Sequence, residues 1–174
     1  PSWSRGLGDV YKRQKDVWPF KVKTDSGKEI QAETIIIATG AQARWLGIES
    51  EEKYNGKGVS ACATCDGFFF KNKNVAVIGG GNTAVEEALY LSKLCQNVTL
   101  IHRRDELRAE KILQNRLFDK KNINILWNNK VDEILGDDFG VNSLKLISTK
   151  DGSETTIKID GIFIAIGHDP STLI

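Results

Sequence analysis

The chain contains the segment Val75-Ala76-Val77-Ile78-Gly79-Gly80-Gly81-Asn82-Thr83-Ala84, which carries the strongest structural signal in the sequence. Its leading residues are all apolar, which is typical of a strand buried on both faces. The glycines that follow predict a tight turn, and from Thr83 to about Cys95 apolar residues recur at helical spacing. Residues 98–101 form the next apolar run. The stretch therefore predicts a strand–turn–helix–strand unit with parallel strands and a right-handed crossover.

The turn has the spacing of a dinucleotide-binding fingerprint, with Gly79, Gly81 and Ala84 at the small positions. The first glycine permits the sharp turn, the second lets the backbone approach a pyrophosphate, and the third small residue lets helix and strand pack closely. The pyrophosphate would bind N–H groups at the start of the helix. A turn that is merely tight is the alternative. The strand before it and the helix after it favour a nucleotide site.

Basic residues follow the second strand of this unit: His102, Arg103 and Arg104, with Arg108 one turn later. NAD sites usually carry an acidic residue about 20 residues after the turn, where it binds the ribose hydroxyls. Guanidinium groups instead match a 2′-phosphate through charge-assisted, often bidentate hydrogen bonds. A solvated basic patch is the alternative, but the position at the strand end favours NADPH. Asp105 departs from a purely basic site and is expected to cap the following helix.

Cys62 and Cys65 form a Cys-x-x-Cys pair that is followed directly by Asp66. Such a pair closes a small disulfide ring and favours the thiolate of one member, which is the form that attacks disulfides. Asp66 is placed to carry a proton as the pair is oxidised and reduced. Half a zinc site and a structural disulfide are the alternatives. The chain has only 3 Cys and 2 His, whereas a structural zinc site needs about four ligands, so no metal site is expected.

Composition and charge exclude several classes of protein. The chain has 174 residues with 24 basic and 23 acidic side chains, a net charge of +1, which gives no case for nucleic acid or a membrane surface as partner. No apolar run approaches the ~20 residues of a transmembrane helix, and no secretory signal is visible. The few cysteines fit a reducing compartment, and Cys95 is expected to be a buried, inert thiol. A cytoplasmic location is therefore expected.

The remaining chain predicts further elements on both sides of this unit. Residues 17–24 and 29–34 predict a strand pair, residues 34–41 a buried strand, and residues 41–57 a connector without clear period. After the basic cluster we expect a helix over 108–120 and a parallel strand over 123–127. Short antiparallel strands are expected at 130–133, 141–149 and 155–159, and a final apolar strand at 161–167. The fold class is α/β, with a Rossmann-like three-layer domain made of a parallel sheet, helices and an antiparallel meander.

Three motifs resemble those of bacterial low-molecular-weight thioredoxin reductases, in the FAD/NADPH pyridine nucleotide-disulfide oxidoreductase family. They are SACATCDG at 60–67, GGGNTAVEEALYL at 79–91 and HRRxxxR at 102–108, in the right order with the right gaps. The likeness runs from about Pro19 to the end of the chain. Flavoprotein subunits of alkyl hydroperoxide reductase are similar, so a reductase of a peroxiredoxin system is the alternative.

The resemblance implies a role for each motif residue. Cys65 would face the flavin, Cys62 would attack the disulfide of thioredoxin, and Asp66 would be the acid–base group. The pyrophosphate would be held by Gly79, Gly81, Asn82 and Thr83, and the 2′-phosphate by Arg103, Arg104 and Arg108. Thr39, Gly40 and Gly167 would mark the crossings between the FAD- and NADPH-binding domains. Such enzymes are homodimers, in which the NADPH domain rotates so that the flavin meets the nicotinamide and the disulfide in turn.

The resemblance also implies a division of the chain. Residues 1–14 are expected to be a non-native or disordered leader, 15–44 a remnant of the FAD-binding domain, 45–169 the NADPH-binding domain, and 170–174 the start of the return to the FAD domain. The glycine-rich FAD-binding unit and the C-terminal flavin segment of the family have no counterpart in the sequence. We therefore expect this chain alone to hold FAD weakly or not at all, and to be by itself an NADP-binding module with a reactive dithiol.

Overall fold

The computed structural model describes residues 18–172, and the expected leader at 1–14 lies outside the described residues. The chain divides into two compact units. One unit is Ala43–Gly167, and the other joins the residues before Ala43 to those from His168 onward. Each unit is described by itself.

A parallel sheet forms the centre of the unit Ala43–Gly167. Its strands follow the order β4-β11-β5-β6-β7, and every neighbouring pair is parallel. The strands are β4 (Val59–Ser60), β11 (Gly161–Ile164), β5 (Asn74–Ile78), β6 (Asn97–His102) and β7 (Ile123–Trp127). The predicted strand–turn–helix–strand unit is thus confirmed.

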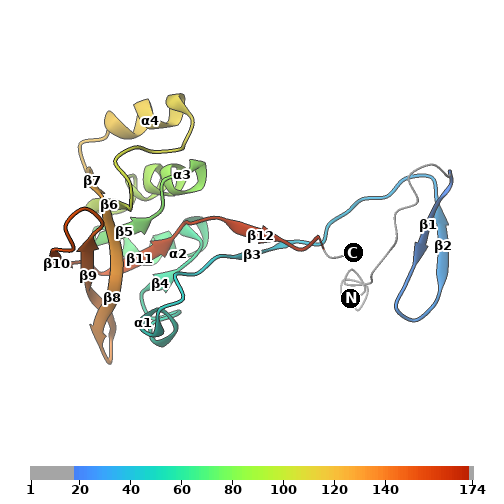
Figure 1. Cartoon of the computed structure of the whole chain (residues 1–174), viewed down its shortest axis with the longest axis horizontal. Helices are drawn as coiled ribbons and strands as arrows, with labels where there is room; N and C mark the ends of the chain where they lie inside the picture. Colours follow the sequence, from blue (N-terminus) through green and yellow to red (C-terminus); the bar gives the residue numbers. More distant parts are fainter. Residues whose placement is uncertain (1–17, 173–174) are drawn as a thin grey trace. The chain divides into compact units, whose positions relative to one another are not determined.

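Helices cover one face of this sheet (Figure 1). They are α2 (Ala63–Asp66), α3 (Asn82–Leu91) and α4 (Lys111–Phe118), and the 3-10 helix η2 (Gly67–Phe70) follows α2. Side chains of a strand point alternately to opposite faces, so Val75 and Val77 join the core beneath the helices while Ala76 and Ile78 join a second core.

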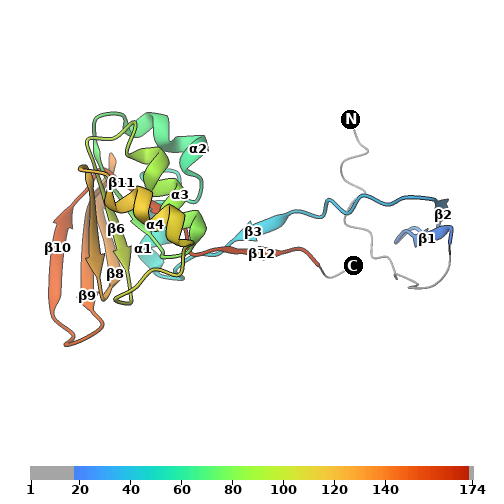
Figure 2. The same ribbon diagram turned by 90° about the horizontal axis from the view of Figure 1, so that it is seen from above.

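An antiparallel meander lies over this second core. It consists of β8 (Asn129–Asp137), β9 (Gly140–Ser148) and β10 (Glu154–Lys158), in the order β10-β9-β8. Leu144 and Leu146 of β9 are fully buried in the same cluster as Ile162 of β11. Figure 2 shows the meander and the helices α3 and α4 on opposite sides of the parallel sheet. The predicted three-layer α/β fold is confirmed.

The other unit contains short antiparallel strands. β1 (Phe20–Lys23) pairs with β2 (Glu29–Ala32) around a turn, which confirms the predicted strand pair. β3 (Ala41–Ala43) pairs with β12 (His168–Pro170). Among residues 18–172, no helix has the length and apolar character that spanning a bilayer requires.

The prediction of a buried strand over 34–41 is wrong. No strand is formed from residue 33 to residue 40, and Ile36 and Ile37 are 89% and 58% exposed. The reason is that no strand in the described part of the chain pairs with this segment, so its backbone has no ladder and its isoleucines have no opposing face.

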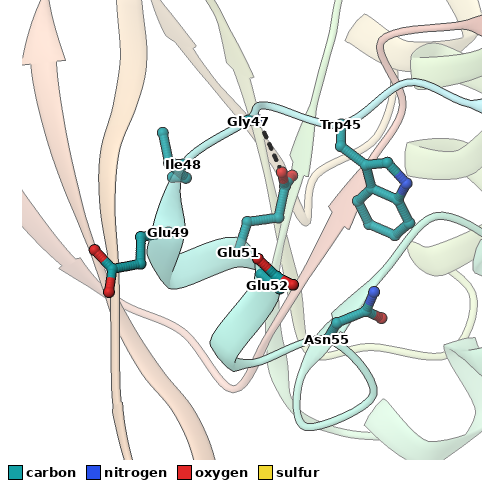
Figure 3. Close-up of a pocket in the computed structure, with 7 residues that line it drawn as sticks. All are labelled: Trp45, Gly47, Ile48, Glu49, Glu51, Glu52 and Asn55. Atoms are coloured by element: carbon teal, nitrogen blue, oxygen red, sulfur yellow. Dashed lines mark hydrogen bonds between the residues drawn. The ribbon is translucent and has the colours of Figure 1, made fainter.

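The connector predicted over 41–57 contains a helix, α1 (Glu49–Lys53), that the sequence analysis missed. The buried residue of this helix is a carboxylate, Glu51, and not an apolar side chain, so its sequence shows no apolar period. Glu51 is 4% exposed, and its two oxygens accept hydrogen bonds from the N–H groups of Leu46 and Gly47, each at 2.9 Å. Figure 3 shows the bond between Gly47 and Glu51.

Both long helices are shorter than predicted. α3 ends at Leu91, before Cys95, and α4 begins at Lys111 rather than at Arg108. Arg108 stays outside α4 because its N–H donates to the carbonyl of Gly80 at 2.7 Å. The N-cap of α4 is Glu110, so the expected cap at Asp105 is wrong.

Candidate functional site

A cavity of about 570 Å³ lies within the unit Ala43–Gly167, where β5 and β6 end. This volume is in the usual range for a ligand site, and the carboxyl edge of a parallel sheet is where α/β folds bind nucleotides. The glycine turn and the basic cluster both line it. The predicted site residues among its walls are Gly79, Gly81, Thr83, His102, Arg103, Arg108 and Gly167.

The glycine turn fits a pyridine nucleotide. Gly79 has φ +151°, and a Cβ there would meet the carbonyl of Ala165 and, at 2.7 Å, the Cβ of Ala84. A Cβ on Gly81 would have no atom within 4 Å, so the backbone there is open to the cavity. The N–H groups in the first turn of α3 have no partner within a helix, which makes them donors for a pyrophosphate.

Gly81→Ala is expected to weaken NADP+ binding by roughly 10- to 100-fold, because a methyl group would occupy the space of the pyrophosphate at a cost of about 1–3 kcal/mol. The same substitution should leave the thermal unfolding temperature nearly unchanged, since the methyl group meets no protein atom. Calorimetric titration and thermal unfolding check the two statements.

Gly79→Ala is the matched variant. Unlike Gly81→Ala, it should lower the stability of the fold. Its methyl group would meet backbone in a conformation that favours glycine, so we expect a loss of about 2 kcal/mol or more of folding free energy. Equal NADP+ affinity in Gly81→Ala and the wild type would show that the pyrophosphate is bound elsewhere.

The ring of His102 packs against the glycine turn at Gly80. His102 is 5% exposed, and a Cβ on Gly80 would collide with its ring. Its Nε2 is 3.0 Å from the carbonyl oxygen of Glu106, and its ring meets Trp127 edge-on at 6.3 Å between centroids. Burial lowers the pKa of His102 and the charges of the neighbouring arginines lower it further, whereas backbone hydrogen bonds to Glu106 and Gly79 oppose the shift.

Lowering the pH is expected to destabilise the wild type through His102. The pKa of His102 is lowered in the folded state, so below about pH 6.5 the unfolded chain takes up a proton that the folded chain does not. This contribution to stability is intact above pH 6.5 and decreases as the pH falls. Urea unfolding at pH 7.5 and 5.5 should show a smaller pH effect in His102→Gln. An unchanged slope in His102→Gln would contradict the assignment.

The arginine loop, residues 103–108, is fixed through its backbone. The carbonyl of Arg103 accepts from Thr149 Oγ1 at 3.1 Å, and that of Arg104 accepts from the N–H of Asn128 at 3.1 Å. Arg103 and Arg108 line the cavity, whereas Arg104 is not among its walls. The structure thus separates Arg104 from the two arginines with which the motif groups it.

Two predicted residues of the glycine turn lie outside the cavity walls: Asn82, predicted to bind the pyrophosphate, and Ala84, predicted to let helix and strand pack closely. The side chain of Asn82 joins the starts of α3 and α4, since its Oδ1 accepts from the N–H of Glu110 at 2.8 Å and its Nδ2 lies 3.4 Å from Glu110 Oε1. Ala84 is fully buried under Gly79. Neither lines the cavity, and Thr39 and Gly40 also lie outside its walls.

The sequence did not indicate the residues outside the two motifs that also line the cavity. Arg44, Lys130 and Thr149 line it together with apolar residues of the chain before α1. Lys130 is near the start of β8 and Thr149 directly follows β9, so the antiparallel register places both at the same end of this strand pair. No local motif marks them, because only the packing of the meander on the sheet brings them to the nucleotide turn.

Cys62 and Cys65 form a disulfide, with 5.3 Å between their Cα atoms. Cys62 is the N-cap of α2, and its sulfur accepts from the N–H of Cys65 at 3.2 Å. Cys65 is exposed and Cys62 is half-buried. In the reduced pair, this N–H donor would favour the thiolate at Cys62.

The disulfide and its acid lie outside the nucleotide cavity. Cys62, Cys65 and Asp66 are not among the cavity walls, although all belong to the same compact unit. The carboxylate of Asp66 accepts from the hydroxyl of Ser60 at 2.6 Å. Cys95 is buried as predicted, and burial raises the pKa of its thiol to about 11.

A second cavity, of about 480 Å³, lies beside α1 (Figure 3). Trp45, Glu49 and Glu52 are among its walls, and the carboxylate of Glu51 is engaged by the backbone as described above. Among the described residues, no group of three or more His, Cys, Asp or Glu side chains is arranged to hold a metal ion.

These features define a nucleotide-binding α/β domain that carries a redox-active disulfide. The sequence model of one family, described as pyridine nucleotide-disulphide oxidoreductase, matches residues 6–174. The chain belongs to the pyridine nucleotide-disulphide oxidoreductase family.

Relatives and solved structures agree with this assignment. The chain is 55% identical over 156 residues to a thioredoxin reductase of Rickettsia conorii, which covers 88% of this chain and 50% of the relative. It is 56% identical over 159 residues to one of Coxiella burnetii, covering 90% and 49%. The crystal structure of Lactococcus lactis thioredoxin reductase is similar with a TM-score of 0.79 and 44% identity, covering 95% and 55%. The chain thus spans about half the length of the curated relatives it matches.

Proposed function

We propose that the whole protein is an NADPH-dependent thioredoxin-disulfide reductase, which passes electrons from NADPH through FAD and the Cys62–Cys65 pair to oxidised thioredoxin. The observation that carries this proposal is the disulfide at the start of α2, in the same compact unit as a nucleotide cavity lined by arginines. The names of the similar proteins support thioredoxin as the substrate. A homodimer in the cytoplasm is part of the same proposal.

In this proposal the cavity selects and orients NADPH. The first turn of α3 would bind the pyrophosphate, and Arg103 and Arg108 would bind the 2′-phosphate. The fixed backbone of the arginine loop favours this role, because preorganised donors lose little freedom when the phosphate binds.

FAD is expected from the chemistry of the family, whereas the described residues provide little of a site for it. FAD, when bound, supplies a group that accepts a hydride and returns an electron pair to a disulfide. Outside Ala43–Gly167, the described residues form two short strand pairs and an extended segment with exposed isoleucines. These residues do not by themselves build a phosphate-binding turn for FAD.

The reduced cysteine pair then acts on the substrate. The Cys62 thiolate would attack one sulfur of the thioredoxin disulfide, breaking that bond and forming a mixed disulfide. Cys65 would next attack Cys62 Sγ, which restores the Cys62–Cys65 bond and releases reduced thioredoxin. Two electrons pass from the pair to the substrate, and Asp66 would carry a proton from Cys65 to the departing sulfur.

Steady-state oxidation of NADPH and of NADH by the complete protein, with oxidised thioredoxin, tests the proposal. We expect kcat/KM to be roughly 100-fold higher with NADPH, since two charge-assisted bonds contribute about 3 kcal/mol or more. Equal use of both nucleotides would refute the NADPH assignment, and thioredoxin that stays oxidised would refute the substrate.

A further inference from the structure

Ser60 is a buried hydroxyl inside the redox segment. It is the last residue of β4, 6% exposed, and it pairs with Phe163 of β11 in the parallel sheet. Its Oγ lies 2.6 Å from Asp66 Oδ2, 3.0 Å from the nitrogen of Cys62 and 3.4 Å from the carbonyl oxygen of Cys62. One side chain therefore contacts both the acid and the first cysteine of the pair.

The direction of each hydrogen bond follows from the chemistry of a hydroxyl group, which has one proton and two lone pairs. The N–H of Cys62 is a donor only, so it uses a lone pair of Ser60 Oγ. The single proton then goes to Asp66 or to the carbonyl of Cys62. The distance of 2.6 Å to Asp66 is in the range of a charge-assisted O–H···O⁻ bond, whereas 3.4 Å to the carbonyl is long. Ser60 thus donates to the Asp66 carboxylate.

This arrangement couples the acid to the cysteine pair through one atom. The backbone of Cys62 orients the hydroxyl, and the hydroxyl holds Oδ2 of Asp66. Because Ser60 ends β4, the carboxylate is tied to a strand of the central sheet. The bond also spares a buried hydroxyl the cost of having no partner.

We propose that Ser60 is a positioning residue for proton transfer at the Cys62–Cys65 pair, holding the Asp66 carboxylate where it receives the proton of Cys65 and delivers it to the thiol that leaves the substrate. The inference rests on the acid–base role of Asp66 in the proposed function. Ser60 itself exchanges neither electrons nor protons with the substrate.

The step balances as follows for a disulfide RSSR. The Cys62 thiolate attacks one sulfur, the S–S bond of the substrate breaks, and a Cys62–S–S–R bond forms. The departing sulfur receives the proton of Cys65 by way of Asp66 and leaves as RSH, so Cys65 becomes a thiolate. Cys65 then attacks Cys62 Sγ, forms the protein disulfide and releases RS⁻. Two electrons move from the protein to the substrate.

Two disulfide substrates distinguish an effect of Ser60 on proton transfer by Asp66 from an effect on the attacking sulfur of Cys62. Hydroxyethyl disulfide releases an aliphatic thiol, which leaves slowly without a proton, whereas an aromatic disulfide of the Ellman type releases a stabilised thiolate that needs none. The pre-reduced 174-residue chain is mixed with each at pH 7, and mixed-disulfide formation is followed by acid quench and mass spectrometry. Cys95, buried with a raised thiol pKa, reacts later than the pair.

Ser60→Ala is expected to lower the ratio of the aliphatic to the aromatic rate constant about tenfold, a fraction of the 10²–10⁴ that general acid–base catalysis typically contributes. Ser60→Thr, which keeps the hydroxyl, should bring the ratio to within about twofold of the wild type. Asp66→Asn should lower it at least as much as Ser60→Ala. Ser92→Ala, which removes a half-buried hydroxyl bound to the carbonyl of Leu89 at 2.8 Å, is the matched control and should leave it unchanged.

The outcomes distinguish the positioning role of Ser60 from the acid–base role of Asp66. An equal loss with both substrates in Ser60→Ala, or no rescue by Thr, would overturn the role of Ser60 as a positioning residue. A lowered ratio in Asp66→Asn with a wild-type ratio in Ser60→Ala would overturn that role and leave the acid–base function of Asp66 standing. An unchanged ratio in Asp66→Asn would overturn both.

Discussion

The double variant Arg103→Gln/Arg108→Gln is expected to bind NADP+ roughly 100- to 10,000-fold more weakly than the wild type, while NAD+ binding changes by less than about threefold. Hydrogen bonds to charged groups contribute about 1.5–3 kcal/mol each, and 1.4 kcal/mol is a factor of ten in affinity. Both side chains line the cavity, and the backbone of the loop that carries them is hydrogen-bonded to Thr149, Asn128 and Gly80. Calorimetric titration of the chain with each nucleotide measures the effect.

Two arginine controls make this result specific. Arg116→Gln, on α4 and outside the cavity walls, should bind both nucleotides as the wild type does. Arg104→Gln should lose less NADP+ affinity than either Arg103→Gln or Arg108→Gln, since Arg104 does not line the cavity. All titrations need the same salt concentration, because salt screens charge interactions. Equal weakening of NAD+ and NADP+ in the double variant would mean that the arginines do not read the 2′-phosphate.

Cys62→Ser is expected to reduce NADPH-dependent reduction of thioredoxin by the complete protein at least about 1,000-fold. A serine hydroxyl is a very poor nucleophile toward disulfides, where the thiolate is the reacting form. The variant also leaves Cys65 without its partner, so the Cys62–Cys65 disulfide that would accept the electrons cannot form. The rate is measured by coupling thioredoxin to the reduction of a chromogenic disulfide.

Cys95→Ala is the matched control for this loss. Cys95 is the only free cysteine among the described residues and is buried beneath the helices, so its removal should change the rate by less than about twofold. Activity that survives Cys62→Ser would refute the dithiol relay.

Local sequence determines the strand–turn–helix segment of the unit Ala43–Gly167, and this segment was predictable. The strand before Gly79 and the helix after it follow from apolar spacing over a few residues, and the glycine positions follow from the turn. Such features need no knowledge of distant residues. The helix α2 that begins after Cys62 was not predicted, and the contact of Cys62 Sγ with the N–H of Cys65 comes from the structure alone.

Features that depend on tertiary contacts were not predictable. The isoleucines 35–37 have the composition of a buried strand, yet burial needs neighbouring strands that the described residues do not provide. α1 depends on a carboxylate that binds backbone five residues away. The backbone of Arg103 and Arg104 is held by donors distant in sequence, Thr149 after β9 and Asn128 before β8.

The central claim is that electrons from NADPH reach the Cys62–Cys65 pair and then thioredoxin. The most direct measurement adds NADPH without oxygen to the complete, flavin-loaded protein, alkylates the thiols and identifies the modified cysteines by mass spectrometry. We expect Cys62 and Cys65 to become alkylated only after NADPH is added, and an excess of oxidised thioredoxin to return both to the disulfide. NADPH that is consumed while the pair remains a disulfide would contradict this claim.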